Sequence, residues 1–324
     1  MKNAKIVGTG RYLPPYRLTN DALSRMVDTS DEWIVSHTGI RERRIAQGET
    51  TAEMGYYAAQ QALENAKIAP EEIDLIIGST VTQDSTCPSM SCMIQGQLGA
   101  KNAFCFDQVA ACSGFVFALE TARQYIATGR VNTVLIVASE MLSKITDYTD
   151  RATCVLFGDG AGAAVLRAAD CGGVLASYMM SDGARGDVLS YRAFENKSPF
   201  AVPREDTLSE HLFMNGHEVY KFAVRAMRQG MEAILNEAGI SASDLAYMIP
   251  HQANIRIITS MVDKFGIPME KVYINLEQYG NMSSACIPVA LDELNRAGKL
   301  SRGDKLALVG FGGGLTCGAA LLEW

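Results

Sequence analysis

Residues 109–115 read Val109-Ala-Ala-Cys112-Ser-Gly-Phe115 and join an expected strand to an expected helix. The strand pattern, Cys105–Val109, ends in small residues, and apolar residues such as Leu119 and Ile126 then recur at helical spacing. A thiol at this junction faces the helix N-terminus, where backbone N–H groups and the helix dipole favour the thiolate. Cys112 is therefore either an activated nucleophile or a buried packing residue, which is the commoner role of a free cysteine.

The same alternation of short β-branched runs and amphipathic stretches extends along the whole chain and predicts an α/β protein. Strands are expected at Lys5–Gly8, Leu75–Ser79, Cys105–Val109, Val134–Ser139, Ala163–Arg167, Tyr247–Pro250, Val272–Leu276 and Lys305–Phe311. Helices are expected at Thr51–Ala66, Ser89–Leu98, Ser113–Thr128, Gly216–Glu237, Ile255–Phe265 and Ser283–Ala297.

An internal repeat relates the two halves of the chain. Leu63-Glu-Asn-Ala66 matches Leu235-Asn-Glu-Ala238, and at the same spacing Cys112 falls on Ser284. Several matches in one order favour an internal duplication with a site between the halves over two unrelated α/β units.

Composition excludes several classes of protein. The 324 residues are 48% hydrophobic and 20% charged, as in globular proteins, and the net charge of −7 argues against nucleic-acid binding. No apolar run approaches the ~18 residues of a membrane span. Residues 1–15 lack the apolar core of a secretory signal, so we expect a cytoplasmic protein whose eight cysteines are free thiols. No spacing suggests a zinc site, and we expect neither a metal nor a cofactor.

Three further motifs follow expected strands or open expected helices. His251 stands in Pro250-His-Gln-Ala-Asn254, just after a strand, and is either a site residue or a loop histidine. Asn281 follows Gly280 before a helix, in a turn whose simplest role is helix capping. The glycines of Phe311-Gly-Gly-Gly314 let backbone N–H groups approach a ligand, or else make a tight turn.

Together these motifs resemble β-ketoacyl-acyl carrier protein synthase III, a family with the thiolase fold. The resemblance rests on AACSGF around Cys112, PHQAN around His251, the Gly-Asn pair at Asn281, and FGGG near the C-terminus. VGTGRYLP, TSDEWI, TGIRERRI and FGDGAGAAVL extend it over nearly the whole chain. It implies two pseudo-repeated α/β halves, residues 1–173 and 174–324, in a five-layered α-β-α-β-α arrangement.

The resemblance also implies a mechanism. Cys112 would take an acyl group from acyl-CoA, a substrate and not a cofactor, and His251 and Asn281 would donate hydrogen bonds to the enolate formed when malonyl-acyl carrier protein loses carbon dioxide. Backbone N–H groups of Cys112 and Gly313 would form the oxyanion hole.

Binding residues are implied in the same way. Trp33, Arg151 and Arg256 would hold the nucleotide end of CoA, together with His37, which replaces the arginine usual in the family. Asn254 and Gly216 would line the pantetheine tunnel. Leu189 and Cys87 would bound the acyl pocket, and Cys87 replaces a frequent phenylalanine that reaches across a homodimer. Lys221 and Arg256 would dock the carrier protein.

Other functions stay open at this stage. A degradative thiolase would have a second cysteine where Phe311 stands, and elongating synthases have a second histidine where Asn281 stands. A synthase III-like enzyme of a specialised or polyketide pathway can retain the same three residues. A non-catalytic carrier-protein binder is the alternative outside enzymes, and the preferred acyl chain is not predicted.

Overall fold

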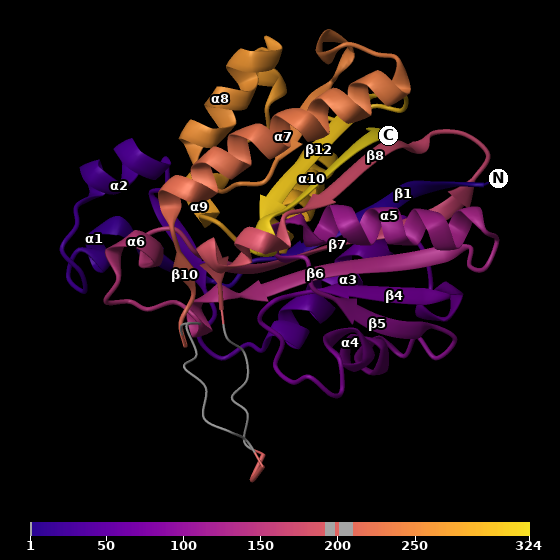
Figure 1. Cartoon of the computed structure of the whole chain (residues 1–324). Helices are drawn as coiled ribbons and strands as arrows, with labels where there is room; N and C mark the ends of the chain where they lie inside the picture. Colours follow the sequence, from indigo (N-terminus) through magenta and orange to yellow (C-terminus); the bar gives the residue numbers. More distant parts are fainter. Residues whose placement is uncertain (1, 192–197, 201–209) are drawn as a thin grey trace.

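Two β-sheets and three layers of helices make up the computed structural model, which describes residues 2–191, 198–200 and 210–324 (Figure 1). The predicted five-layered α/β fold is confirmed. From one side to the other, the layers are α3 and α4, the first sheet, α5 and α10, the second sheet, and α7 and α8. The bounds of these helices are Thr51–Ala66 for α3, Met90–Leu98 for α4, Gly114–Ala127 for α5, Gly216–Ala238 for α7, Ile255–Phe265 for α8 and Cys286–Arg296 for α10.

The first sheet has the strand order β1-β7-β6-β4-β5, with β4 parallel to both β5 and β6. The sheet is mixed, because β7 pairs antiparallel with both β1 and β6. Its central strand β6 is buried along nearly its whole length because helices cover both faces of the sheet. The five strands are β1 (Asn3–Tyr12), β4 (Leu75–Ser79), β5 (Phe104–Gln108), β6 (Thr133–Met141) and β7 (Asp159–Ala169).

The second sheet has the order β11-β12-β13-β8 and is built only from later residues. Its strands are β8 (Gly173–Ser181), β11 (Tyr247–Pro250), β12 (Lys305–Gly312) and β13 (Thr316–Glu323). The strand β11 runs parallel to β12, as β4 does to β5 and β6. Two smaller pairs, β2 (Tyr16–Thr19) with β3 (Glu42–Ile45) and β9 (Leu189–Ser190) with β10 (Phe213–Met214), lie outside the main sheets.

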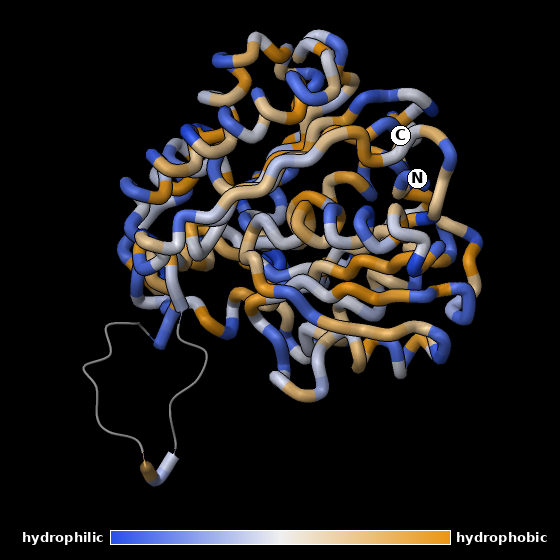
Figure 2. Tube along the Cα trace, turned by 45° about the vertical axis from the view of Figure 1, so that its right-hand side comes forward, coloured by the Kyte–Doolittle hydropathy of each residue, from blue (hydrophilic) through white to orange (hydrophobic). Residues whose placement is uncertain are grey.

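Hydrophobic residues concentrate along the strands of the sheets, while hydrophilic residues are frequent in the outer turns (Figure 2). The buried apolar residues lie on these strands and on the helices that pack against them. The middle helices α5 and α10 are buried most completely, because each packs between the two sheets. No helix within the described residues combines the length and apolarity needed to cross a membrane.

One expected strand, Val272–Leu276, is wrong. Val272 forms only an isolated bridge with Met248. The Gln252 side chain then accepts hydrogen bonds from the backbone N–H groups of Asn275 and Leu276 at 3.0 and 3.3 Å, which turns the chain into a short helix. That helix is α9 (Leu276–Tyr279), and the other short helices are α1 (Asn20–Leu23), α2 (Asp31–Thr38) and α6 (Arg151–Cys154).

Candidate active site

A largely apolar cavity of about 640 Å³ lies where the turns after β5, β11 and β12 meet. Cys112, His251, Asn281 and Gly313 all line it, although they come from separate parts of the chain. Its other walls include the side chains of Val81, Leu142, Ile145, Leu156, Leu212, Met214, Val219 and Ile257.

Cys112 lies in a 3-10 turn, Ala111–Ser113, immediately before α5. Ala111 has a positive φ of 45°, an uncommon backbone conformation for a residue with a side chain, and this sharp turn presents Cys112 to the cavity. The end of β12 crosses very close behind it, since a Cβ on Gly312 would lie 2.6 Å from the Cys112 backbone nitrogen. Glycine is therefore required at 312 by close approach.

Burial dominates the ionisation of Cys112. The side chain is 8% exposed, and loss of hydration raises the pKa of the thiol to about 12, with a further rise from the nearby Glu140 carboxyl. Ser283 acts in the opposite direction. The expectation that the helix N-terminus lowers the pKa of Cys112 is thus wrong for this state. The free-energy cost of removing a thiolate from water exceeds the stabilisation that the helix N-terminus provides.

His251 directly follows β11 and is 1% exposed. Its backbone N–H donates to Val309 O at 2.7 Å, and its ring meets Phe311 edge-on with centroids 5.4 Å apart. Burial lowers the pKa of His251 to about 3, so the imidazole is neutral at physiological pH. Nδ1 has no hydrogen-bond partner among the described residues. A neutral ring carries one N–H donor, and can offer it to a substrate oxygen.

Asn281 is fixed by both its backbone and its side chain. Its N–H donates to Leu156 O at 2.9 Å, and its carbonyl accepts from Gly158 N at 3.0 Å. The side-chain Oδ1 accepts from Ser283 N at 2.8 Å. Because the oxygen is engaged, the amide NH₂ is the group that Asn281 presents as a donor.

Gly313 and Leu189 face each other across the cavity wall. A Cβ on Gly313 would lie 3.3 Å from Leu189 O and 3.4 Å from the Ala111 side chain. The glycine run therefore brings bare backbone alongside the nucleophile turn, the arrangement that an oxyanion hole needs.

The residues expected to bind the nucleotide form one cluster between α2, α6 and α8. Trp33 and His37 stack with ring centroids 4.4 Å apart, and the Arg151 guanidinium lies 4.7 Å from the centre of the Trp33 ring. Asn254 donates to His37 O at 3.0 Å, and Arg256 donates to Ser36 O at 3.0 Å. Asn254 and Gly216 also line the cavity, so the cluster is continuous with it.

Two expected residues, Cys87 and Lys221, lie outside both the cavity lining and the nucleotide cluster. Cys87 is exposed and does not line the cavity of its own chain. Lys221 is exposed on α7 and forms an ion pair with Glu218 at 3.1 Å, although its neighbour Tyr220 does line the cavity.

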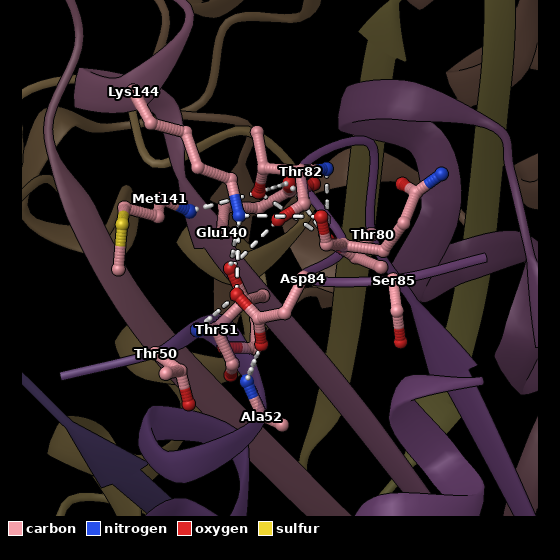
Figure 3. Close-up of polar contacts among 12 residues, drawn as sticks. Thr50, Thr51, Ala52, Thr80, Thr82, Asp84, Ser85, Glu140, Met141 and Lys144 are labelled. Carbon is pink, nitrogen blue, oxygen red and sulfur yellow. Dashed lines mark hydrogen bonds and ion pairs between the residues drawn. The ribbon is translucent and has the colours of Figure 1, made fainter. Parts of the chain in front are cut away.

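Sequence reasoning missed Glu140 and the pair Ser283 and Ser284. Glu140 is fully buried near the end of β6, and Figure 3 shows it among Thr80, Thr82 and the Lys144–Asp84 ion pair. Ser284 donates to Glu140 at 2.8 Å. A carboxylate inside the apolar run Val134–Met141 is the sequence signal that could have revealed it, since unpaired buried charges are costly.

Within residues 2–191, 198–200 and 210–324, no group of three or more His, Cys, Asp and Glu side chains is arranged to hold a metal ion.

Comparisons with known proteins agree with this geometry. Residues 106–183 match the family described as 3-oxoacyl-acyl-carrier-protein synthase III, and residues 235–324 match the C-terminal domain of the same family. A beta-ketoacyl-acyl-carrier-protein synthase III of Clostridium acetobutylicum is 50% identical over 324 residues, covering 100% of this chain and 99% of the relative.

Solved structures give the same result. The 3-oxoacyl-acyl-carrier-protein synthase III of Aquifex aeolicus superposes with a TM-score of 0.93 at 44% identity, covering 99% of this chain and 100% of that one. The priming β-ketosynthase of the R1128 polyketide biosynthetic pathway superposes with a TM-score of 0.92 at 36% identity, covering 99% and 96%. With this identity over its full length and the cysteine, histidine and asparagine gathered at one cavity, the chain belongs to the β-ketoacyl-acyl carrier protein synthase III family.

Proposed function

We propose that this protein is the initiating condensing enzyme of type II fatty acid synthesis. It joins acyl-CoA to malonyl-acyl carrier protein and releases 3-oxoacyl-acyl carrier protein, CoA and carbon dioxide. One observation carries the proposal: Cys112, His251 and Asn281 come from three different turns and line the same cavity, each fixed by its own backbone.

In the first half-reaction, the Cys112 sulfur attacks the acyl thioester and CoA leaves. The developing oxyanion lies against the backbone N–H groups of Cys112 and Gly313, an arrangement worth about 3–4 kcal/mol of barrier in such sites. The acyl chain occupies the apolar part of the cavity, where burial favours it by about 0.8 kcal/mol per methylene.

In the second half-reaction, malonyl-acyl carrier protein loses carbon dioxide and leaves a thioester enolate. The neutral imidazole of His251 and the amide of Asn281 donate hydrogen bonds to the enolate oxygen. Because the pKa of His251 is about 3, the imidazole supplies a donor without supplying a proton. The enolate carbon then attacks the acyl group on Cys112.

Substrate delivery and assembly are part of the proposal. Trp33, with His37 and Arg151 packed against its ring, binds the CoA nucleotide, and the exposed cations Lys221 and Arg256 contact an acidic carrier protein. The enzyme works as a homodimer in the cytoplasm.

The direct test is intact-mass analysis of the protein across an acyl-CoA series, followed by addition of malonyl-acyl carrier protein. We expect one acyl group per chain, mapped to Cys112, and its loss when the second substrate is added. An unlabelled protein that still binds carrier protein would instead indicate a non-catalytic binder.

Priming of a polyketide pathway is the second candidate. It is favoured by the 36% identity to the R1128 priming synthase over 99% of this chain. The two candidates differ in the carrier protein, so the test compares condensation rates with a fatty-acid carrier protein and with a polyketide carrier protein. A preference for the polyketide carrier would overturn the first candidate.

A further inference from the structure

Glu140 is a buried carboxyl that the proposed mechanism does not use. Its Oε2 accepts hydrogen bonds from Val81 N at 3.0 Å, from Thr82 Oγ1 at 2.8 Å and from Thr80 Oγ1 at 3.3 Å. Its Oε1 accepts from Ser284 Oγ at 2.8 Å. Figure 3 shows Glu140 meeting Thr80 and Thr82 near the end of its strand. The carboxyl therefore joins a turn in the first half of the chain to a turn in the second half.

The place of Ser284 in the second half corresponds to that of the nucleophile in the first half. Cys112 follows Ala111, which has a positive φ of 45°, in the 3-10 turn just before α5. Ser284 follows Ser283, which has a positive φ of 48°, in the 3-10 turn just before α10. The internal repeat of the sequence thus extends to the backbone conformation of these two turns.

The strands beside the two turns correspond in the same way. The strand β4 begins its pairing with β6 at Leu75 and Val134, and β11 begins its pairing with β12 at Tyr247 and Leu306. The second pair of residues is related to the first by the spacing of the internal repeat. The two pairs of parallel strands therefore have the same register.

In this register Glu140, near the end of β6, corresponds to Gly312, at the end of β12. Gly312 places bare backbone against Cys112, since an added Cβ would lie 2.9 Å from the Cys112 Cβ. In the other half, a carboxyl is hydrogen-bonded to the hydroxyl of Ser284. Glu140 and Ser284 are both buried, and neither lines the cavity. The repeat therefore has one pair that faces substrate and a second pair that joins the two halves.

The bond between Ser284 and Glu140 affects Asn281 through the residue between them in the turn. Ser283 donates its N–H to Asn281 Oδ1 at 2.8 Å, which fixes the plane of the amide. The positive φ of Ser283 is a strained conformation that persists only where neighbouring contacts hold it. The hydroxyl of Ser284 supplies two such contacts, to Glu140 at 2.8 Å and to Ser79 O at 3.2 Å.

We propose that Glu140 is a positioning residue for Asn281 and acts through Ser284. This inference rests on the proposed function, in which Asn281 donates to the enolate oxygen. The contacts of Oε2 fix the carboxyl, and the contact of Oε1 fixes the turn that orients the amide. Without this link, the backbone bonds of Asn281 to Leu156 and Gly158 still hold the residue in place, but the direction of its NH₂ group is no longer fixed.

The test is Ser284→Ala, which removes the hydroxyl and keeps the Cβ that faces Gly114 at the start of α5. We expect kcat for decarboxylation of malonyl-acyl carrier protein to fall about tenfold, less than the 10²–10³-fold cost of removing a donor outright. The KM for this substrate and the rate at which acyl-CoA acylates Cys112 should stay close to the wild-type values. Decarboxylation at the wild-type rate would overturn the inference.

Two variants of Glu140 separate geometry from charge. Glutamine keeps an oxygen for Val81 N–H, and its NH₂ can donate to Ser284 Oγ while the serine proton is donated to Ser79 O. We therefore expect Glu140→Gln to decarboxylate at close to the wild-type rate, and Glu140→Ala to lose at least as much activity as Ser284→Ala. An equal loss in both Glu140 variants would show that the negative charge is required, which would overturn a positioning role.

Ser139→Ala is the matched control. Ser139 precedes Glu140 on β6, is buried, and donates to Thr51 O at 2.7 Å, so its loss removes a comparable hydrogen bond within the first half. We expect Ser139→Ala to lower the thermal unfolding temperature as Ser284→Ala does, but to decarboxylate normally. Equal losses of decarboxylation in the two serine variants would indicate general loosening of the fold and would overturn the inference.

Hydrogen exchange separates this inference from the proposed function. Exchange of peptides that cover residues 276–290 is followed by mass spectrometry in the free protein. We expect faster exchange in Ser284→Ala and in Glu140→Ala than in the wild type or in Ser139→Ala, and unchanged exchange would contradict the positioning role. If the wild type neither accepts an acyl group nor decarboxylates, the proposed function fails, while the exchange rates still decide whether Glu140 fixes the turn.

Discussion

His251 and Cys112 are both buried, and burial moves their pKa values in opposite directions. It raises the pKa of the thiol to about 12 and lowers that of the imidazole to about 3. Both groups are therefore neutral at pH 7, and the cavity holds an uncharged nucleophile beside an uncharged donor. This arrangement suits a site that alternately receives an apolar acyl chain and stabilises a transient enolate.

The separation of roles among residues gives the first prediction. In His251→Ala and in Asn281→Ala, we expect decarboxylation of malonyl-acyl carrier protein to fall about 10²–10³-fold, the usual cost of losing one such donor. Cys112 should still accept an acyl group, as measured by intact mass. Wild-type decarboxylation in both variants would show that the donor roles are wrong.

The ionisation of His251 gives the second prediction. Because its folded pKa is about 3, the rate of decarboxylation should show no inflection near the ordinary histidine pKa of about 6.5. The unfolded chain binds this proton near pH 6.5 and the folded chain only near pH 3. The contribution of the neutral imidazole to the free energy of unfolding is therefore complete above about pH 6.5 and decreases as the pH falls toward 3. Decarboxylation by Cys112→Ala, followed from pH 5 to 9, isolates the effect. An inflection near 6.5 would mean that a protonated imidazole takes part.

At the scale of elements, the nucleophile depends on how β12 ends. Gly312 passes so close to Cys112 that an added Cβ would lie 2.6 Å from its nitrogen and 2.9 Å from its Cβ. Backbone atoms cannot yield as a flexible side chain can.

Gly312→Ala should therefore displace the Cys112 turn, and we expect acylation to fall at least 10²-fold, since a misplacement of about 1 Å can cost that much. The control is Gly183→Ala, which has no neighbour within 4 Å of the added atom. The measurement is the acylation rate by quenched-flow mass analysis together with thermal unfolding. A normal rate in Gly312→Ala would mean that the two elements are not rigidly apposed.

Sequence alone predicts the elements with strong periodicity. The bounds of α3, α8, β4 and β11 match the expected ranges, since each has a clear apolar pattern and a turn signal at its ends. The sequence alone does not predict β8 or β13. In β13 the small residues Thr316-Cys-Gly-Ala-Ala320 have weak β propensity and form a strand because β12 and β8 pair with them on both sides. Glu140 and Ser284 are missed for a related reason, because only tertiary packing brings them together.

On the scale of the whole molecule, the first sheet ends at an edge strand, β5. Phe104 at its start and Val109 just beyond it are 43% and 73% exposed, although both are large and apolar. The unpaired backbone N–H and C=O groups of such an exposed apolar edge strand can form hydrogen bonds with a strand of another chain.

We expect this edge to form a homodimer, with a mass in sedimentation of twice 35.0 kDa. Phe104→Glu should weaken the dimer by at least tenfold in Kd, because it places a charge at the edge. Met269→Glu, at an equally exposed apolar residue away from β5, is the control. An active monomer of 35.0 kDa would contradict the interface.

The acyl-chain specificity also depends on the assembly of two chains, if Cys87 contributes to it. Cys87 is exposed and does not line the cavity of its own chain. If it bounds the partner's cavity, its small side chain leaves room where a phenylalanine would close the pocket. We then expect the wild type to accept butyryl- and longer or branched acyl-CoA as well as acetyl-CoA. Discrimination should be modest, since one methylene in an apolar pocket is worth about 10–200-fold at most.

Mixed dimers distinguish action across the interface from action within one chain. One subunit carries Cys112→Ala and Cys87→Phe and cannot be acylated, and the other has the wild-type sequence. If residue 87 acts across the interface, the phenylalanine of the inactive subunit should restrict the substrate range of the active subunit to acetyl-CoA. The measurement is kcat/KM over the acyl-CoA series. Mixed dimers carrying only Cys112→Ala are the control and should keep the broad specificity. An unchanged acyl preference with the phenylalanine present would place the closure of the pocket on residues of the same chain.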